Sequence, residues 1–103
     1  MNYRIIKSPS SGTVDILFRR KGSASTIPLA NYDAVGLVQG KLIDMVFAAD
    51  IAEKAAGVVV EDIKGHCPQN LIMIAIFGDT ASVEAAIQEI QYKLNEEKTG
   101  AIQ

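Results

Sequence analysis

Two strongly apolar runs separated by a short connection constrain the fold of this chain more than any other feature. Val58–Val60 precedes the connection and Leu71–Phe77 follows it, and both runs are rich in β-branched or large apolar residues, which is typical of buried strands. The connection Gly65–Gln69 contains Gly and Pro, so we expect it to be exposed. It also holds the only cysteine of the chain, Cys67, directly after the only histidine, His66.

One thiol and one imidazole limit the chemistry of this connection. Zinc and iron–sulfur centres usually take four ligands, so Cys67 and His66 of a single chain cannot complete either kind of site. The motif can act as a metal site only if several copies of the chain meet at a symmetry axis. The oligomeric state is therefore part of the functional question.

Length, composition and charge exclude several classes of protein. The chain has 103 residues, of which 49% are hydrophobic and 21% charged, as expected for a single globular domain with a modest core. Ten basic against twelve acidic residues give a net charge of −2 without a basic block, which argues against nucleic acid as a partner. No apolar run reaches the ~20 residues of a membrane span, and the first residues do not resemble a signal peptide. One cysteine excludes an intrachain disulfide and fits the reducing cytoplasm.

The first third of the chain predicts a strand, a helix and a linker. Tyr3–Lys7 has the composition of a short strand, and the turn residues of Ser8–Gly12 end it. Thr13–Arg20 fits both an alternating strand and a helical face, and we favour the helix because Gly22 would end it well. Lys21–Asn31 contains a proline and little periodicity, which predicts a linker or loop.

The remaining pattern predicts an α+β fold. The first expected elements are a strand at Ala34–Val38 and a helix with apolar positions from Leu42 to Ala56 that stops at Gly57. Two strands follow at Val58–Ile63 and Leu71–Phe77. After a turn and N-cap at Gly78–Thr80, we expect a helix with an apolar stripe from Val83 to Leu94 and a frayed polar tail at Asn95–Gln103. With the N-terminal strand added, this order predicts a ferredoxin-like antiparallel sheet with helices on one face.

Two motifs resemble the shell proteins of bacterial microcompartments (BMC). Ala48–Val58 is similar to their first helix, and Ile76–Ala86 is similar to their Gly-Asp turn and the helix that follows it. The resemblance covers residues 33–94 but departs from the usual order, in which a further strand follows the last helix. It implies a circularly permuted BMC domain, with residues 1–32 as the permuted strand and its extension, 33–94 as the core and 95–103 as a tail.

The connection Gly65–Gln69 resembles the motif of the GrpU-type shell proteins of glycyl-radical propanediol microcompartments. This resemblance implies a cyclic homohexamer with Gly65–Asn70 around its central pore, assembled with other shell proteins around the enclosed enzymes of a glycyl-radical pathway. It also implies an iron–sulfur cluster of the 4Fe-4S type, bound by Cys67 of several subunits, for electron transfer or cluster delivery across the shell. A ring of six thiols does not match the four ligands of such a cluster. Our hypothesis is that alternate subunits supply three Cys67 thiolates and that the fourth iron keeps a small or solvent ligand.

The residues around Cys67 allow more than one role. His66 is a solvated turn residue, a hydrogen-bond donor to the ligands or a ligand itself, and a ring of Cys and His would also suit zinc. Pro68 restricts the backbone of Cys67 to extended conformations, and Gly65 is suited to backbone angles that other residues resist. Gln69 can hydrogen-bond to sulfur or line the pore.

Lys54 also has two interpretations. It is either an ordinary exposed lysine of a helix or, as the resemblance implies, a residue at the hexamer edge that packs against its mate in a neighbouring hexamer.

Three other functions remain open at this point. The chain could form a plain shell hexamer with a metabolite-conducting pore, or a ferredoxin-like regulator that binds a small ligand, although it lacks a Gly-rich phosphate loop. An enzyme with Cys67 as its nucleophile is disfavoured, because adjacent residues on an extended segment point apart and no carboxylate is evident to orient His66. We therefore predict that the protein is not an enzyme.

Overall fold

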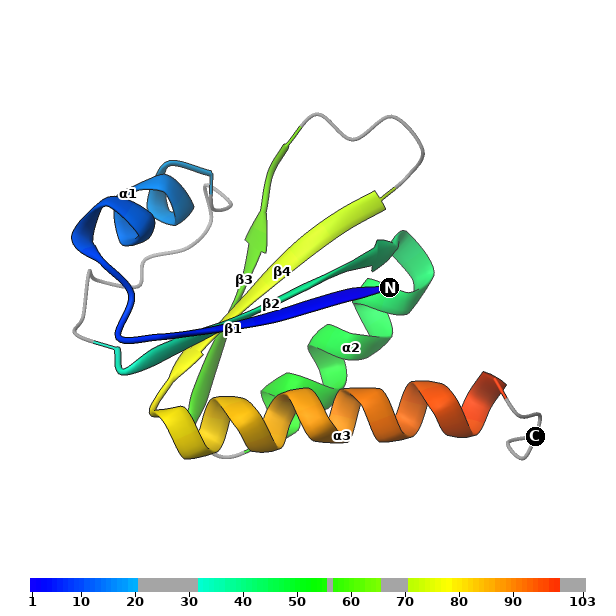
Figure 1. The fold of residues 1–103 in the computed structure, drawn as a ribbon. Coiled ribbons are helices and arrows are strands. Elements are labelled where there is room, and N and C mark those ends of the chain that lie inside the picture. The colour runs from blue at the N-terminus through cyan, green and yellow to red at the C-terminus, as the bar shows by residue number, and fades with distance from the viewer. Residues whose placement is uncertain (21–31, 56, 66–70, 99–103) are drawn as a thin grey trace.

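The computed structural model describes residues 1–20, 32–55, 57–65 and 71–98. Seven elements follow one another along the chain (Figure 1). They are β1 (Asn2–Lys7), α1 (Ser11–Arg20), β2 (Ala34–Lys41), α2 (Leu42–Lys54), β3 (Val58–Ile63), β4 (Leu71–Gly78) and α3 (Thr80–Lys98).

The four strands form one antiparallel sheet in the order β1-β2-β4-β3. The register is set by the two central strands, where Val38 of β2 faces Ile74 of β4. Successive side chains of a strand point to opposite faces, so the apolar residues of β2 and β4 supply a core to both sides of the sheet. This explains why Leu71–Phe77 has no polar alternation.

The helices α2 and α3 cover one face of the sheet (Figure 1). Met45, Ile76 and Ile90 are completely buried between these helices and the strands. The close approach of α3 depends on Gly36, because a Cβ at that position would lie 3.0 Å from Cγ1 of Val83. The predicted α+β fold with an antiparallel sheet is confirmed, but only α2 and α3 share one face of that sheet.

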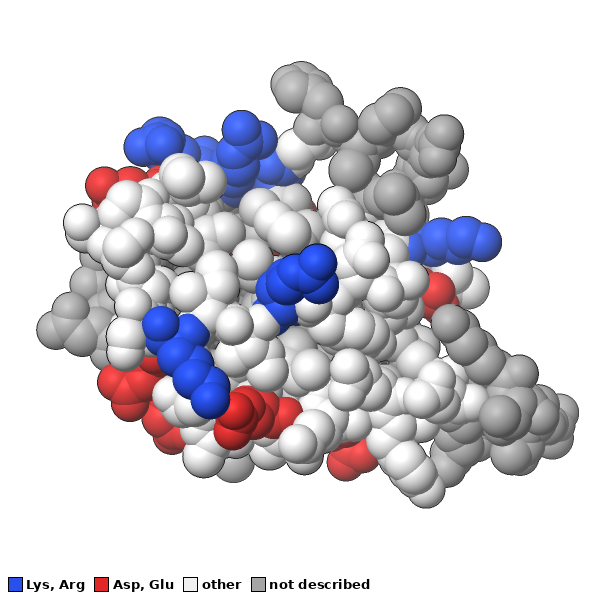
Figure 2. All heavy atoms as spheres, in the orientation of Figure 1, with Lys and Arg blue, Asp and Glu red and all other residues white. Residues whose placement is uncertain are grey.

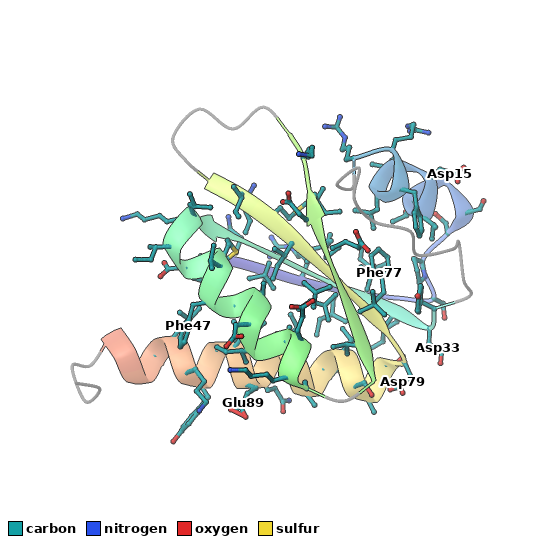
Figure 3. The ribbon with its side chains drawn as sticks, turned by 180° about the vertical axis from the view of Figure 1, so that it is seen from behind. Asp15, Asp33, Phe47, Phe77, Asp79 and Glu89 are labelled. Carbon is teal, nitrogen blue, oxygen red and sulfur yellow. The ribbon has the colours of Figure 1, made fainter. Side chains whose placement is uncertain are left out.

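The helix α1 lies against the opposite face (Figure 1). Leu17 is 5% exposed and packs with Phe77, whose ring stacks on Phe18 at a centroid distance of 5.8 Å. Tyr32 approaches the same ring at 5.3 Å. Figure 3 shows Phe77 on this side of the sheet, away from Phe47 of α2. The helical interpretation of Thr13–Arg20 is thus confirmed.

Several element ends differ from the sequence predictions. β2 continues to Lys41 rather than ending at Val38, and α2 ends at Lys54, because Ala55 is already extended, rather than continuing to Gly57. Gly57 has φ +83° and lies in the connection to β3. The predicted frayed tail from Asn95 is wrong at its start, because α3 continues to Lys98. Nothing breaks the helix there, since Glu and Lys are good helix formers. The predicted linker Lys21–Asn31 and residues 99–103 lie outside the described residues.

Asp79 caps the N-terminus of α3, as the sequence predicts. Its Oδ1 accepts a hydrogen bond from the backbone N–H of Ser82 at 2.7 Å, and its Oδ2 accepts one from the Ser82 hydroxyl at 3.1 Å. These hydrogen bonds, the backbone one first, favour the carboxylate and lower the pKa of Asp79.

Candidate functional site

The candidate site is the connection between β3 and β4. The last paired residues are Ile63 and Met73, after which β3 continues into the exposed residues Lys64 and Gly65. His66, Cys67, Pro68 and Gln69 lie outside the described residues, so the structure describes only the root of the predicted site. Its two flanking strands form the antiparallel pair that the sequence predicts.

The root of the connection is held by the end of α1. The backbone N–H of Lys64 donates a hydrogen bond to the carbonyl oxygen of Arg20, the last residue of α1, at 2.6 Å. This contact joins segments that are far apart in the sequence. The placement of Lys64, at the root of the connection, therefore depends on α1 as well as on the sheet.

Gly65 does not use the left-handed backbone conformation for which glycine is suited. Among the described residues, positive φ occurs at Ser8 and Gly57 and not at Gly65. A Cβ at Gly65 would have the guanidinium Nη1 of Arg20 as its nearest neighbour, at 4.0 Å. Gly65 therefore has space and backbone angles that suit a small side chain.

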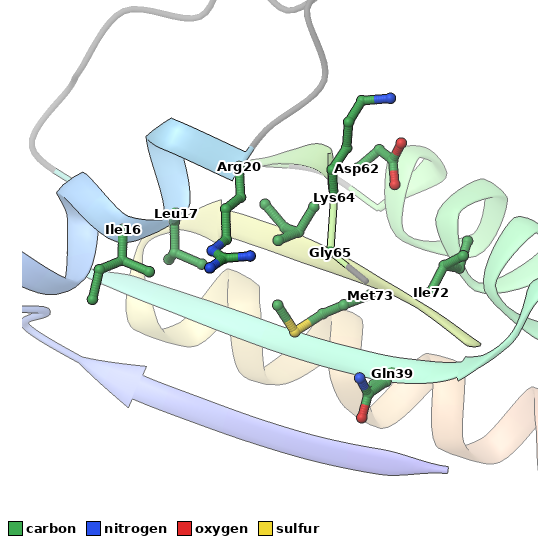
Figure 4. Close-up of a pocket in the computed structure, with 10 residues that line it drawn as sticks. Ile16, Leu17, Arg20, Gln39, Asp62, Lys64, Gly65, Ile72 and Met73 are labelled. Atoms are coloured by element: carbon green, nitrogen blue, oxygen red, sulfur yellow. The ribbon is translucent and has the colours of Figure 1, made fainter. Parts of the chain in front are cut away.

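A hollow of about 580 Å³ lies beside this root, between α1 and the sheet (Figure 4). Apolar side chains form most of its lining, and its charged residues are Arg20, Asp62 and Lys64. The lining residues are Ile16, Leu17, Arg20, Gln39, Asp62, Ile63, Lys64, Gly65, Ile72 and Met73.

Basic side chains gather around the end of α1. Arg19 and Arg20 occupy its last turn, and Lys64 follows β3. Figure 2 shows blue atoms over this region, where α1 ends and β3 approaches the connection. Across the described part of the chain, the ion pairs are Lys7 with Glu84 and Lys54 with Asp50, so these three cations take part in none.

Lys54 is the last residue of α2 and lies at the opposite end of β3 from Gly65. Its Nζ is 2.8 Å from Oδ2 of Asp50, and its side chain is 76% exposed. A groove of about 480 Å³ passes beside it, lined also by Phe47 and Glu89, which Figure 3 labels on the helical side. The structure thus does not bring Lys54 and Gly65 together, and it leaves the ammonium group accessible.

The first turns of α2 carry apolar residues that the fold leaves uncovered. Leu42, Ile43 and Val46 are 51%, 78% and 62% exposed. The sequence pattern placed Leu42 and Val46 in an apolar stripe but did not show that they face outward. A helix that is apolar around most of its surface usually lies buried, so these side chains indicate a contact outside the single chain.

The donor set tests whether one chain suffices for a metal centre. Within the described ranges there is no group of three or more His, Cys, Asp or Glu side chains that could hold a metal ion. The whole sequence has one cysteine and one histidine. An iron–sulfur cluster on this protein therefore needs Cys67 from more than one chain.

None of the helices in the described part of the chain has the length and apolar character needed to cross a membrane.

Comparison with known proteins gives a family match and two close structural matches. The BMC domain family matches residues 34–101. The chain is similar to the ligand-free GrpU microcompartment shell protein from Clostridiales bacterium 1_7_47FAA, at 55% identity over 96% of this chain and 98% of that one, with a TM-score of 0.74. It is also similar to the ligand-free GrpU microcompartment shell protein from Pectobacterium wasabiae, at 39% identity over 87% and 99% of the two chains, with a TM-score of 0.71. Curated protein sequences gave no significant match.

Proposed function

Because this chain belongs to the BMC-domain family and is a structural protein of a bacterial microcompartment shell, we propose that it forms a cyclic homohexamer whose Cys67 connections meet at the central pore. Proteins of this family assemble with other shell proteins and are structural rather than catalytic, so the prediction that the chain is not an enzyme is confirmed. The small-ligand regulator is set aside on the same ground. The exposed apolar residues Leu42, Ile43 and Val46 support a contact with a second copy.

The order of the strands supports a circular permutation. The edge strand β1 comes first in the chain and pairs with β2. If β1 instead followed α3, the elements from β2 onward would have the order β-α-β-β-α-β of the ferredoxin-like fold. The start of β1 and the end of α3 lie on the same side of the molecule, on the right in Figure 1, which fits such a change of connection.

We further propose that Cys67 thiolates from alternate subunits hold an iron–sulfur cluster at the pore. The supporting observation is the ligand count: one cysteine per chain, on a connection between two paired strands, becomes a sufficient set only when copies converge. His66, Pro68, Gln69 and Gly65 would surround the cluster. When bound, it would accept and release single electrons across the shell, or serve as a supply of clusters for enclosed glycyl-radical enzymes.

The decisive variant is Cys67→Ala, purified without oxygen beside the wild type. We expect brown wild-type protein with bound iron and sulfide, and colourless variant protein. His66→Ala is the matched control, because it changes the neighbouring residue and leaves the thiols; it should keep most of the iron if His66 is not a ligand. If wild type stays colourless after anaerobic reconstitution, the cluster proposal fails and a metabolite-conducting pore becomes the better function. Bound zinc without sulfide would point to the Cys/His zinc ring instead.

Lys54 provides a separate test of the assembly. If Lys54 makes the contact between hexamers, Lys54→Ala should abolish extended sheets in electron micrographs. Hexamers should persist when sized by light scattering, because the exposed ammonium group lies outside the packed core. Lys93→Ala is the matched control, since this exposed lysine lines the same groove from α3. Dissociation of Lys54→Ala to monomers would contradict the edge role.

A further inference from the structure

We propose that the hollow between α1 and the sheet binds a small organic anion, with its carboxylate or phosphate group on Arg20 and a short apolar body inside the hollow. This site is separate from the Cys67 thiols, and the proposal does not depend on a cluster being present. Its volume, about 580 Å³, falls within the usual range for small-molecule pockets.

The apolar part of the hollow is suited to a short hydrocarbon chain. Leu17 and Ile63 are each 5% exposed and belong to the core of this face, and Met73 packs against them. Ile16 also lines the hollow and is 49% exposed. A hydrocarbon chain placed here would cover apolar surface that now meets water.

The charged part of the hollow is suited to an anion. Figure 4 shows the Arg20 side chain reaching from the end of α1 over the hollow toward Met73. Among the described lining residues, two cations, Arg20 and Lys64, face one carboxylate, Asp62, which gives this part of the lining an excess of one positive charge. Arg20 forms no ion pair with any other described residue. Its planar fork matches the geometry of a carboxylate or a phosphate.

The ligand would also lie at the base of the Cys67 connection. Arg20 presents its guanidinium to the hollow, and its carbonyl oxygen accepts the hydrogen bond from Lys64 at 2.6 Å. Gly65 follows Lys64, and a Cβ placed on it would lie 4.0 Å from Nη1 of the same guanidinium. An anion bound here would therefore contact both segments that position the connection.

The experiment titrates the full-length protein, in its natural assembly, with hexanoate and hexyl phosphate by isothermal calorimetry. We expect both anions to bind, and hexylammonium, which has the same chain and the opposite charge, to bind at least ~10-fold more weakly. Saturation by hexanoate alone would assign the site to carboxylates, and saturation by hexyl phosphate alone to phosphate monoesters. Failure of both anions to bind, or equal binding of hexylammonium, would overturn the proposal.

Two arginine variants locate the site. Arg20→Gln should weaken hexanoate binding by ~10-fold or more, as expected for the loss of a hydrogen bond to a charged group. Arg19→Gln is the matched control, because Arg19 lies in the same last turn and does not line the hollow; it should change binding less than ~2-fold. Equal losses in the two variants would show that diffuse charge, and not this hollow, attracts the anion. Arg20→Lys, which keeps the charge but not the fork, should fall between them and preserves the test if Arg20→Gln unfolds.

Discussion

On one face of the sheet, α2 and α3 enclose Met45, Ile76 and Ile90 completely, whereas on the other α1 buries Leu17 and leaves a hollow of about 580 Å³ beside it. The first face is a continuous core shared by two helices and all the central strands. The second face is a smaller core around Phe77, with charged groups at its edge. The comparison indicates that the helical face carries most of the stability, while the α1 face is free to carry binding groups and to hold the root of the Cys67 connection.

The largest effect is expected on the helical face, for Ile76→Ala. This residue is fully buried, so its truncation should lower the free energy of unfolding by ~3–4 kcal/mol through lost transfer and a residual cavity. Urea denaturation at one matched protein concentration measures it. Ile72→Ala, in the same strand at a half-buried position, is the control and should cost less than half as much. A loss below ~1 kcal/mol for Ile76→Ala would refute the proposed difference between the faces.

A smaller effect is expected for Leu17→Ala on the α1 face. We expect a loss of ~2 kcal/mol, because the hollow beside Leu17 allows the neighbouring side chains to relax into the space. Native-state hydrogen exchange should show amides of α1 losing protection while those of β2 and β4 keep theirs. The neighbouring Ile16→Ala, at a 49% exposed position, is the control. It should change neither the free energy of unfolding nor the protection of the α1 amides. Loss of protection across the whole sheet would mean that the two faces unfold as one unit.

The smallest effect concerns the cap of α3 and depends on pH. Hydrogen bonds from Ser82 depress the folded-state pKa of Asp79 below its ordinary value of 3.8, so the carboxylate contributes stability above that value. The contribution should disappear as the pH falls through the lower folded pKa. The difference in unfolding free energy between wild type and Asp79→Asn should therefore narrow in acid. Ser82→Ala removes the hydroxyl hydrogen bond and keeps the one from the backbone N–H, so its Asp79 should retain part of the pH-dependent stability. A difference between wild type and Asp79→Asn that does not change with pH would contradict the role of the Asp79 carboxylate as a cap.

The same contrast explains which elements were predictable from sequence. The bounds of β3 match the predicted Val58–Ile63, because the Gly57 stop and the apolar run are both local signals. The segment of α1 was ambiguous, since Val14, Ile16 and Phe18 alternate as in a strand. Packing on Phe77 decides in favour of the helix, and that contact joins residues distant in the chain.

The candidate site was predictable only in part, for a related reason. The β3–β4 connection and its thiol follow from neighbouring residues, and the flanking strands are confirmed. The hollow was not predicted, because it requires Arg20 to meet Lys64, which lies far from it in the sequence. The exposure of Leu42 and Ile43 was not predicted either, since helical spacing does not distinguish burial within a chain from burial between chains.

The edge position of β1 has a consequence for the order in which the protein folds. During synthesis β1 emerges before its partner β2, which follows only after α1 and residues 21–31. Closing this longer loop costs more chain entropy than closing the β3–β4 hairpin. We therefore expect β1 to join the sheet late, with its backbone groups exposed to solvent and to other nascent chains until β2 arrives.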